Sequence, residues 1–269
     1  MKHHRLLSSA LFTAVLIVSP VAQAKDIMYL LQSRAGMSET RSPTNIPYSY
    51  TMHIDLAYLD GDGNRDVKAE VRIDPSKPAG SRARIVTTTQ RHRKDLTEFL
   101  EHIEDTETSM AALANGFWCK SVHDNEDVDL STYTVISQTD MEAVLKPSPD
   151  KLAELLLQKG NGDMDKSERK MKKKLLDRID GHIIVSKRDG GTKGFKVGMT
   201  RSVTRKTIVK FKTMSLEQNC AVAPNGHRYK SEMKFSVRGK ALGRAFSGEH
   251  DIRISNLKPI PTLVIPTRL

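Results

Sequence analysis

The sequence predicts a mainly β protein of the α+β class, in which a large curved antiparallel sheet, an open or half barrel, wraps around a few helices. Most of the chain alternates apolar and polar residues with a period of two, which is typical of strands with one buried and one solvated face. A few segments instead have apolar stripes at helical spacing, and these need the dry face of a sheet to pack against. A large twisted sheet tends to curl, which gives the half barrel.

The predicted strands share this alternation and are separated by turn signals. The first hairpin pairs 50–58 with 67–73 across a turn rich in Asp and Gly, and Pro224-Asn225-Gly226 predicts another because Asn-Gly suits a tight turn. The expected strands are 50–58, 67–73, 82–88, 128–136, 141–145, 182–187, 194–199, 203–212, 228–238 and 252–254.

Helical spacing predicts two helices over 94–105 and 108–114, a short Leu-rich helix over 150–158, and a charged helix over 163–180. Residues 25–46 have few periodic signals and are expected to be an N-terminal tail. No internal repeat or linker is evident beyond it, so 47–269 is predicted to be a single domain.

Residues 1–24 have the composition of a secretory signal peptide. Lys2 and Arg5 give a positive start, 6–18 is apolar and uncharged, and Ala22-Gln23-Ala24 has the small residues that signal peptidase recognises. We expect cleavage after Ala24, because the apolar stretch is short for a membrane span. The signal holds two basic residues and no acidic one, so the net charge of the mature chain is 11 − 2 = +9. The signal looks bacterial, so we expect the mature protein to be exported to the periplasm.

The two cysteines exclude a disulfide-dense mini-domain and a zinc or iron–sulfur site with four cysteine ligands. Because the periplasm oxidises thiols, a Cys119–Cys220 bridge is the simplest arrangement. Two buried free thiols are the alternative.

One acidic turn is a candidate metal site, and the sequence lacks the common catalytic motifs. Asp60, Asp62, Asn64 and Asp66 have the odd spacing of a calcium loop, but the sixth and twelfth positions are not the required Gly and Glu, and a hairpin turn explains the same residues. The sequence has no G-x-S-x-G elbow and no H-E-x-x-H helix. We therefore predict no metal, no cofactor and no enzyme, with a hydrolase that lacks a recognisable motif as a third hypothesis.

The charged helix is the densest basic stretch and is a candidate surface for anionic lipid or lipopolysaccharide. A nucleic-acid role is disfavoured by the lack of interleaved aromatics and by the signal peptide. The simpler interpretation is a solvated helix face above a stripe of Met171, Leu175 and Ile179. The candidate residues for an anionic surface are Lys166, Arg169, Lys170, Lys173 and Lys174.

The signal, the order of elements and several local strings resemble the LolA/LolB-like superfamily of periplasmic lipoprotein carriers, in an uncharacterised bacterial branch. The resemblance covers roughly 48–257. Its strings mark turns and strands and lie at Arg72–Arg82, Leu145–Pro149, Ile179–Val185 and Asn219–Tyr229. The resemblance implies an apolar cavity between sheet and helices that suits acyl chains, and it carries over no functional residue.

The function expected from these observations is a non-enzymatic periplasmic carrier or chaperone for lipid or lipidated protein. The alternative is a basic-surfaced interaction protein with a filled core, which binds an anionic envelope component or an acidic protein. Representative cavity positions on the predicted dry face are Ile54, Val71, Phe211, Met233 and Phe235.

Overall fold

The computed structural model describes residues 43, 45–60, 63–78, 80–89, 96, 100–101, 114, 116–119, 132–157, 164–205 and 208–261. Its strands are β1 (Tyr48–Asp60), β2 (Gly63–Ile73), β3 (Ala83–Thr88), β4 (Tyr133–Gln138), β5 (Glu142–Pro147), β6 (Ile179–Ser186), β7 (Thr192–Met199), β8 (Val203–Arg205), β9 (Val209–Val222), β10 (Arg228–Ala241) and β11 (Arg244–Pro259). Its labelled helices are α4 (Pro149–Leu157) and α5 (Lys166–Leu175).

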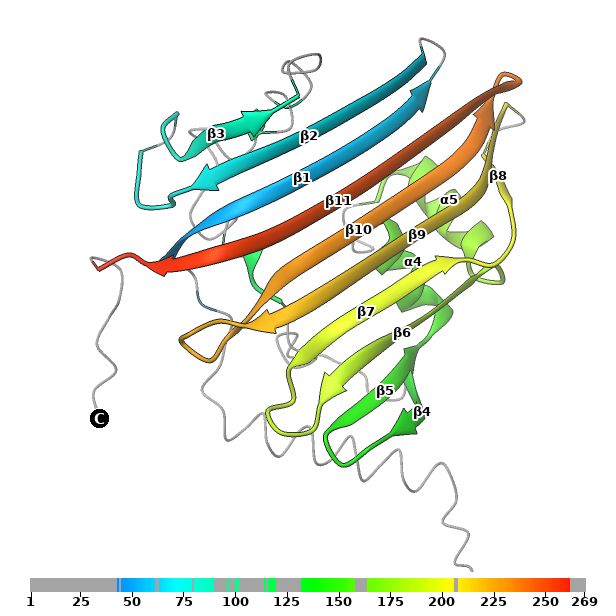
Figure 1. The fold of residues 1–269 in the computed structure, drawn as a ribbon. Helices are drawn as coiled ribbons and strands as arrows, with labels where there is room; N and C mark the ends of the chain where they lie inside the picture. Colours follow the sequence, from blue (N-terminus) through cyan, green and yellow to red (C-terminus); the bar gives the residue numbers. More distant parts are fainter. Residues whose placement is uncertain are drawn as a thin grey trace, which may run out of the picture.

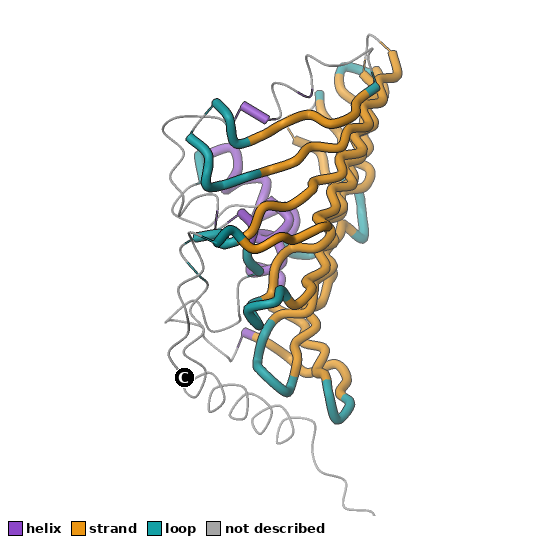
Figure 2. Tube along the Cα trace, turned by 60° about the vertical axis from the view of Figure 1, so that its left-hand side comes forward, coloured by secondary structure: helices purple, strands orange, loops and turns teal. Residues whose placement is uncertain are grey.

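The strands form one 11-stranded sheet in the order β3-β2-β1-β11-β10-β9-β7-β6-β5-β4, with β8 paired to β9 beside this path. Neighbouring strands pair antiparallel, and the first strand, β1, pairs with the last strand, β11, so these two strands lie side by side in the middle of the sheet. Figure 1 shows this open, twisted sheet, and Figure 2 shows both helices on one side of it. The predicted mainly β class and the open antiparallel sheet are confirmed.

We call the face that carries α4 and α5 the inner face. Strand register aligns its apolar side chains into rows that cross the sheet, because every second residue of each strand points the same way. One row passes from Leu56 on β1 through His250, Phe235 and Leu216 to Val197 on β7. The alternation read from the sequence is therefore a single apolar surface shared by neighbouring strands.

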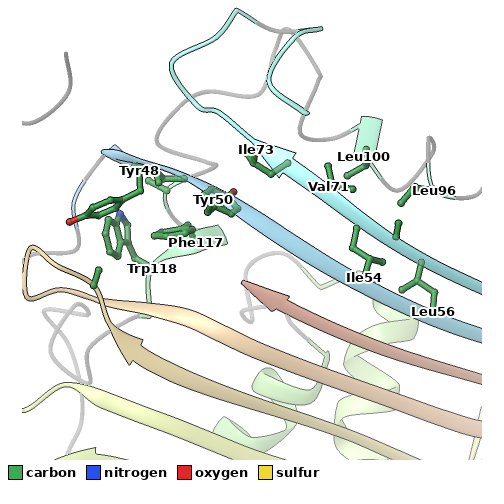
Figure 3. Packing of buried hydrophobic residues seen from close by; sticks show 14 of the residues in the cluster. Tyr48, Tyr50, Ile54, Leu56, Val71, Ile73, Leu96, Leu100, Phe117 and Trp118 are labelled. Carbon is green, nitrogen blue, oxygen red and sulfur yellow. The ribbon is translucent and has the colours of Figure 1, made fainter. Parts of the chain in front are cut away.

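Two large clusters of buried residues cover the inner face, one on β1 and β2 and the other on β6, β7 and β9. In the first, shown in Figure 3, the side chains of β1 and β2 pack against Leu96, Leu100, Phe117 and Trp118. In the second, α4 and α5 pack on β6, β7 and β9 through Leu152, Leu156, Met171 and Leu175. A smaller cluster joins β5 to β6.

The opposite, outer face is polar, and much of its charge is paired across or along strands. Lys68 on β2 bridges Asp55 on β1 at 2.9 Å, and Arg238 on β10 bridges Glu249 on β11 at 2.6 Å. Lys196 bridges Glu217 at 3.4 Å. The prediction of one solvated face is confirmed, but these ion pairs mean that the face carries mixed charge and is not uniformly basic.

The charged helix is shorter than predicted. Asp165 caps it by accepting hydrogen bonds from the backbone of Ser167 and Glu168, and the Glu168 side chain closes the capping box. The helix ends at Leu175, and Ile179 is the first residue of β6. The predicted apolar stripe through Ile179 was therefore wrong, because Ile179 is buried as part of a strand.

Three strand predictions were wrong in phase or extent. In edge strand β4 the sequence alternation through Thr134 and Ile136 predicts these positions on one face, but the half-buried side chains are Tyr133 and Val135, and Ile136 is 55% exposed. The stretch 203–212 is not one strand but the pair β8 and β9. The last strand is longer than 252–254, since β11 forms a hairpin with β10 through a turn that the sequence did not signal.

Several predictions fall largely outside the described residues. These are the signal peptide over 1–24, the tail over 25–46, the helices over 94–105 and 108–114, and the start of the strand over 128–136. Their described members include Ile46, Leu96, Leu100 and Ala114, and all four are buried. Within the described part of the chain, no helix has the length and apolarity needed to cross a membrane.

Gly181 lets α4 lie close against the sheet. A Cβ on this residue would stand 2.4 Å from the backbone oxygen of Lys196 and 3.0 Å from Cδ2 of Leu152 on α4. We expect Gly181→Ala to lower the free energy of unfolding by about 2 kcal/mol, because backbone on one side prevents relaxation. Gly116→Ala is the matched control, since a Cβ there meets nothing within 4 Å. Equal urea midpoints for the two variants would contradict this packing.

Candidate functional site

The middle of the inner face is apolar but only half-buried. We define the inner strip as the half-buried inner-face side chains of the central strands: Tyr58, Phe211, Met233, Phe235, Val237, Phe246 and His250. It lies between the first buried cluster, on β1 and β2, and the second, beneath α4 and α5. Apolar side chains that remain accessible between two filled cores are the part of this face available to a ligand.

Glycines on the central strands shape the strip. A Cβ on Gly239 would stand 2.4 Å from Cζ of Phe246, so the Phe246 ring lies directly over this glycine. Phe246 also meets Phe211 edge-on, with ring centroids 5.8 Å apart. At Gly248 a Cβ would have Val237 and the Tyr58 ring within 4 Å. The absence of side chains here lets large rings lie low on the sheet.

The predicted cavity positions divide between two environments. Ile54 and Val71 are 2% and 0% exposed and belong to the first buried cluster. Phe211, Met233 and Phe235 are half-buried members of the inner strip. The structure therefore brings together three of the five positions, on β9 and β10, and places the other two inside a filled core.

His250 is the one residue of the strip that ordinarily titrates near neutral pH. Its ring contacts Tyr58 edge-on at 5.3 Å and Phe235 at 5.7 Å between centroids. Burial among these rings lowers the pKa of His250 below its ordinary value of 6.5. The imidazole is therefore neutral at neutral pH, which keeps the strip free of charge.

This lowered pKa gives stability a pH dependence. Below pH 6.5 the unfolded chain takes up a proton at His250 before the folded protein does, so the free energy of unfolding falls as the pH falls from 6.5 toward the folded pKa. Replacing the ring by His250→Phe is expected to flatten this part of the profile. Urea unfolding between about pH 7.5 and about pH 5.5 measures it, and parallel profiles for the two proteins would contradict the assignment.

The predicted anionic-surface residues lie on α5, and all of them are exposed: Lys166, Arg169, Lys170, Lys173 and Lys174. Lys174 is tied to the sheet, since its Nζ donates a 2.6 Å hydrogen bond to the backbone oxygen of Thr204 on β8. The arrangement leaves α5 with a basic outer surface close to the β8 end of the sheet.

Lys172, between these residues, has a different role from its neighbours. Its side chain is 7% exposed, and its Nζ donates to Asp150 at 2.7 Å and Glu154 at 2.8 Å on α4. Burial opposes the ammonium charge, but hydrogen bonds and attraction from the two carboxylates outweigh it and raise the pKa of Lys172. Lys172 therefore joins α5 to α4. Sequence reasoning missed this, because a run of lysines does not reveal which one points inward.

The predicted Cys119–Cys220 disulfide is present. It joins the segment 116–119 to β9, and the backbone of Cys119 also donates a 2.9 Å hydrogen bond to the oxygen of Arg228 on β10. Trp118 adds a bridge to Tyr229, and its indole Nε1 donates to the oxygen of Asn45 at 2.9 Å. These contacts fix the first buried cluster at one end of the central strands.

The outer face has a shallow polar hollow of about 420 Å³, which the sequence did not indicate. It is lined by both signs of charge, including Asp55, Lys68, Glu70 and Arg253, and by Thr87 to Thr89. Among the described residues, no group of three or more His, Cys, Asp or Glu could hold a metal ion. The hollow lacks the apolar lining that is typical of small-molecule sites, so the inner strip is the stronger candidate.

No family model matches the chain. No curated protein matches it either. Among solved structures, the chain is similar to the crystal structure of a LolA superfamily protein from Nitrosomonas europaea, with 11% sequence identity over 87% of this chain and 93% of that one. The TM-score of this match is 0.26. The function proposed below rests on this chain's own geometry.

Proposed function

We propose that the protein is a non-enzymatic periplasmic carrier or chaperone that holds the acyl chain of a lipid or lipidated protein against the inner strip. The observation that carries this proposal is the half-buried apolar strip between two filled clusters. Ligand sites are mostly apolar and concave, with few polar groups. The strip has this composition, since its titratable groups are a neutral histidine and a tyrosine.

The length of the strip fits an acyl chain. Along β10 the strip runs from Met233 to Gly239, over which the Phe246 ring lies, and at about 3.3 Å per residue this stretch covers about 20 Å. That is the order of length of an extended fatty acyl chain. A flat aromatic ligand would be too short for this strip. A sugar would find few groups there with which to form hydrogen bonds.

Export to the periplasm is part of the proposal. The expected signal peptide provides the route, and the Cys119–Cys220 disulfide suits an oxidising compartment.

Native mass spectrometry of protein purified from the periplasm, combined with organic extraction, tests the proposal. We expect a stoichiometric acyl-bearing species that is released by organic solvent. Protein that is free of lipid and that also fails to take up an acyl probe in solution would overturn the carrier function.

The second candidate is the basic-surfaced interaction protein, and the exposed bases of α5 favour it. In that case the ligand is an anionic envelope component or an acidic protein. Its signature is salt-sensitive binding to anionic polymers with no bound acyl chain.

A further inference from the structure

One end of the sheet exposes two large apolar side chains on residues whose backbones are neighbours. Leu242, in the β10–β11 turn, is 77% exposed, and Ile208, just before β9, is 51% exposed. The backbone N–H of Leu242 donates a 2.9 Å hydrogen bond to the backbone oxygen of Ile208, so the two residues are neighbours across the strands. We call Ile208 and Leu242 the apolar tip. Single scattered apolar residues are ordinary on protein surfaces, whereas exposed apolar residues that gather in one place can mark an interaction site.

The turn that presents Leu242 does not favour leucine. Leu242 and Gly243 both have positive φ, +50° and +82°, as a two-residue type I′ hairpin turn requires. Asn-Gly is the preferred pair there, and a bulky residue in the left-handed region is an outlier. Leu242 therefore costs the fold stability, and its side chain recovers none of it by burial.

The apolar tip is surrounded by positive charge. Lys210 on β9 and Lys240 on β10 lie directly opposite each other in the register, and like charges in this position repel. Both are exposed, as is Arg244 on β11, and none of the three makes an ion pair with another described residue. This differs from the neighbouring outer face, where Arg238 is paired with Glu249.

Helix α5 and the beginning of the inner strip lie at the same end of the sheet. Lys174 of α5 binds the backbone of β8, and Figure 1 shows α5, β8 and the β10–β11 hairpin at the same end of the sheet. The contacting rings of Phe211 and Phe246 begin the inner strip a few residues below the apolar tip. The inner strip therefore begins within a few residues of the apolar tip.

We propose that this end of the sheet docks on an anionic lipid bilayer, with Ile208 and Leu242 entering the boundary between headgroups and acyl chains. Unpaired cations around a small apolar surface match the chemistry of interfacial binding, in which apolar burial and attraction to anionic headgroups add. A consequence for transport rests on the proposed carrier function. The same contact brings the membrane next to the inner strip, so that an acyl chain can pass from one to the other.

Co-sedimentation with vesicles of phosphatidylglycerol and phosphatidylcholine tests the proposal. We expect the mature protein to bind the anionic vesicles, to bind pure phosphatidylcholine weakly, and to dissociate as salt rises. Leu242→Asn is expected to reduce binding about tenfold, while the protein stays at least as stable, since Asn suits the turn. Lys240→Gln with Arg244→Gln is expected to reduce it by a similar factor.

The matched control is Val222→Thr. Val222 is 55% exposed beside the β9–β10 turn, which lies at the opposite end of the sheet in Figure 1. The control is expected to bind vesicles as the wild type does. No binding by the wild type, full binding by Leu242→Asn, or an equal loss in Leu242→Asn and the control Val222→Thr would overturn the docking surface.

A tryptophan placed at the apolar tip reports its depth. In Leu242→Trp, brominated lipids should quench a part of the emission that they do not quench in Val222→Trp, and the native Trp118 is buried in both. Equal quenching in the two variants would contradict insertion. Leu242→Asn should still bind a soluble acyl probe with wild-type affinity. A variant that loses vesicles but keeps the probe therefore separates docking from the carrier function.

Discussion

Replacing both Cys119 and Cys220 by serine is expected to lower the free energy of unfolding by about 4–5 kcal/mol. The bridge closes a loop of 101 residues, and in the chain-entropy model the loss of such a cross-link frees the unfolded chain by this amount. The folded state also loses the covalent tie that holds the segment 116–119 on β9.

Urea unfolding followed by the single tryptophan measures this effect. Trp118 is buried next to Cys119, so its emission reports the region in which the bridge lies. Reduction of the wild-type protein with dithiothreitol is the control and should give a similar loss, because it breaks the same bond without changing a side chain. A loss below about 1 kcal/mol in both would contradict the stabilising role of the bridge.

Replacing Phe235 by aspartate is expected to reduce the affinity for a fluorescent acyl probe by more than about tenfold. The carboxylate would sit in the middle of the inner strip beside a neutral histidine, and an acyl chain laid over it would bury an unpaired charge. Phe235→Ala is expected to weaken binding less, because it removes apolar area without adding charge.

Thr213→Asp is the matched control for the charge. Thr213 is exposed on the outer face of β9, opposite Arg238, so the same carboxylate is placed one strand away on the other side of the sheet. Its affinity for the probe should equal that of the wild type. If Phe235→Asp fails to fold, as judged by circular dichroism, the probe affinities of Phe235→Ala and Thr213→Asp are compared instead, and only Phe235→Ala should bind more weakly. Equal affinities in that pair would contradict binding at the strip.

The sheet was predictable because alternation depends only on which face a residue points to. Tyr50, Ile54 and Leu56 on β1 are each less than 7% exposed, as their period of two indicates. The turn at Asn225-Gly226 was also predictable, and Gly226 has the positive φ that it requires. In each case the local chemistry and the tertiary structure favour the same conformation.

The structural predictions were wrong where the local sequence gives no signal or a misleading one. The turn at Leu242-Gly243 carries no Asn-Gly signal, so the β10–β11 hairpin was missed. In edge strand β4 the half-buried positions are Tyr133 and Val135, one residue out of phase with the alternation through Thr134 and Ile136. Lys172 looks like any other lysine of its run until α4 supplies two carboxylates.

The candidate site was predictable only in part. Alternation identified Phe211, Met233 and Phe235 as inner-face residues, but it gave the same prediction for Ile54 and Val71. What covers each residue depends on segments far away in the chain: Leu96 and Leu100 belong to the cluster that buries Ile54. A strand pattern gives the face of a residue, whereas accessibility to a ligand is a tertiary property.

Photo-crosslinking with a fatty acid that carries a diazirine at the end of its chain tests the central claim most directly. The mature protein is loaded with the probe, irradiated and digested, and the modified residues are located by mass spectrometry. We predict modification of inner-strip residues on β9, β10 and β11, with competition by unlabelled fatty acid. Modification confined to the outer-face hollow around Asp55 and Arg253, or modification that unlabelled fatty acid does not reduce, would contradict the acyl-binding function.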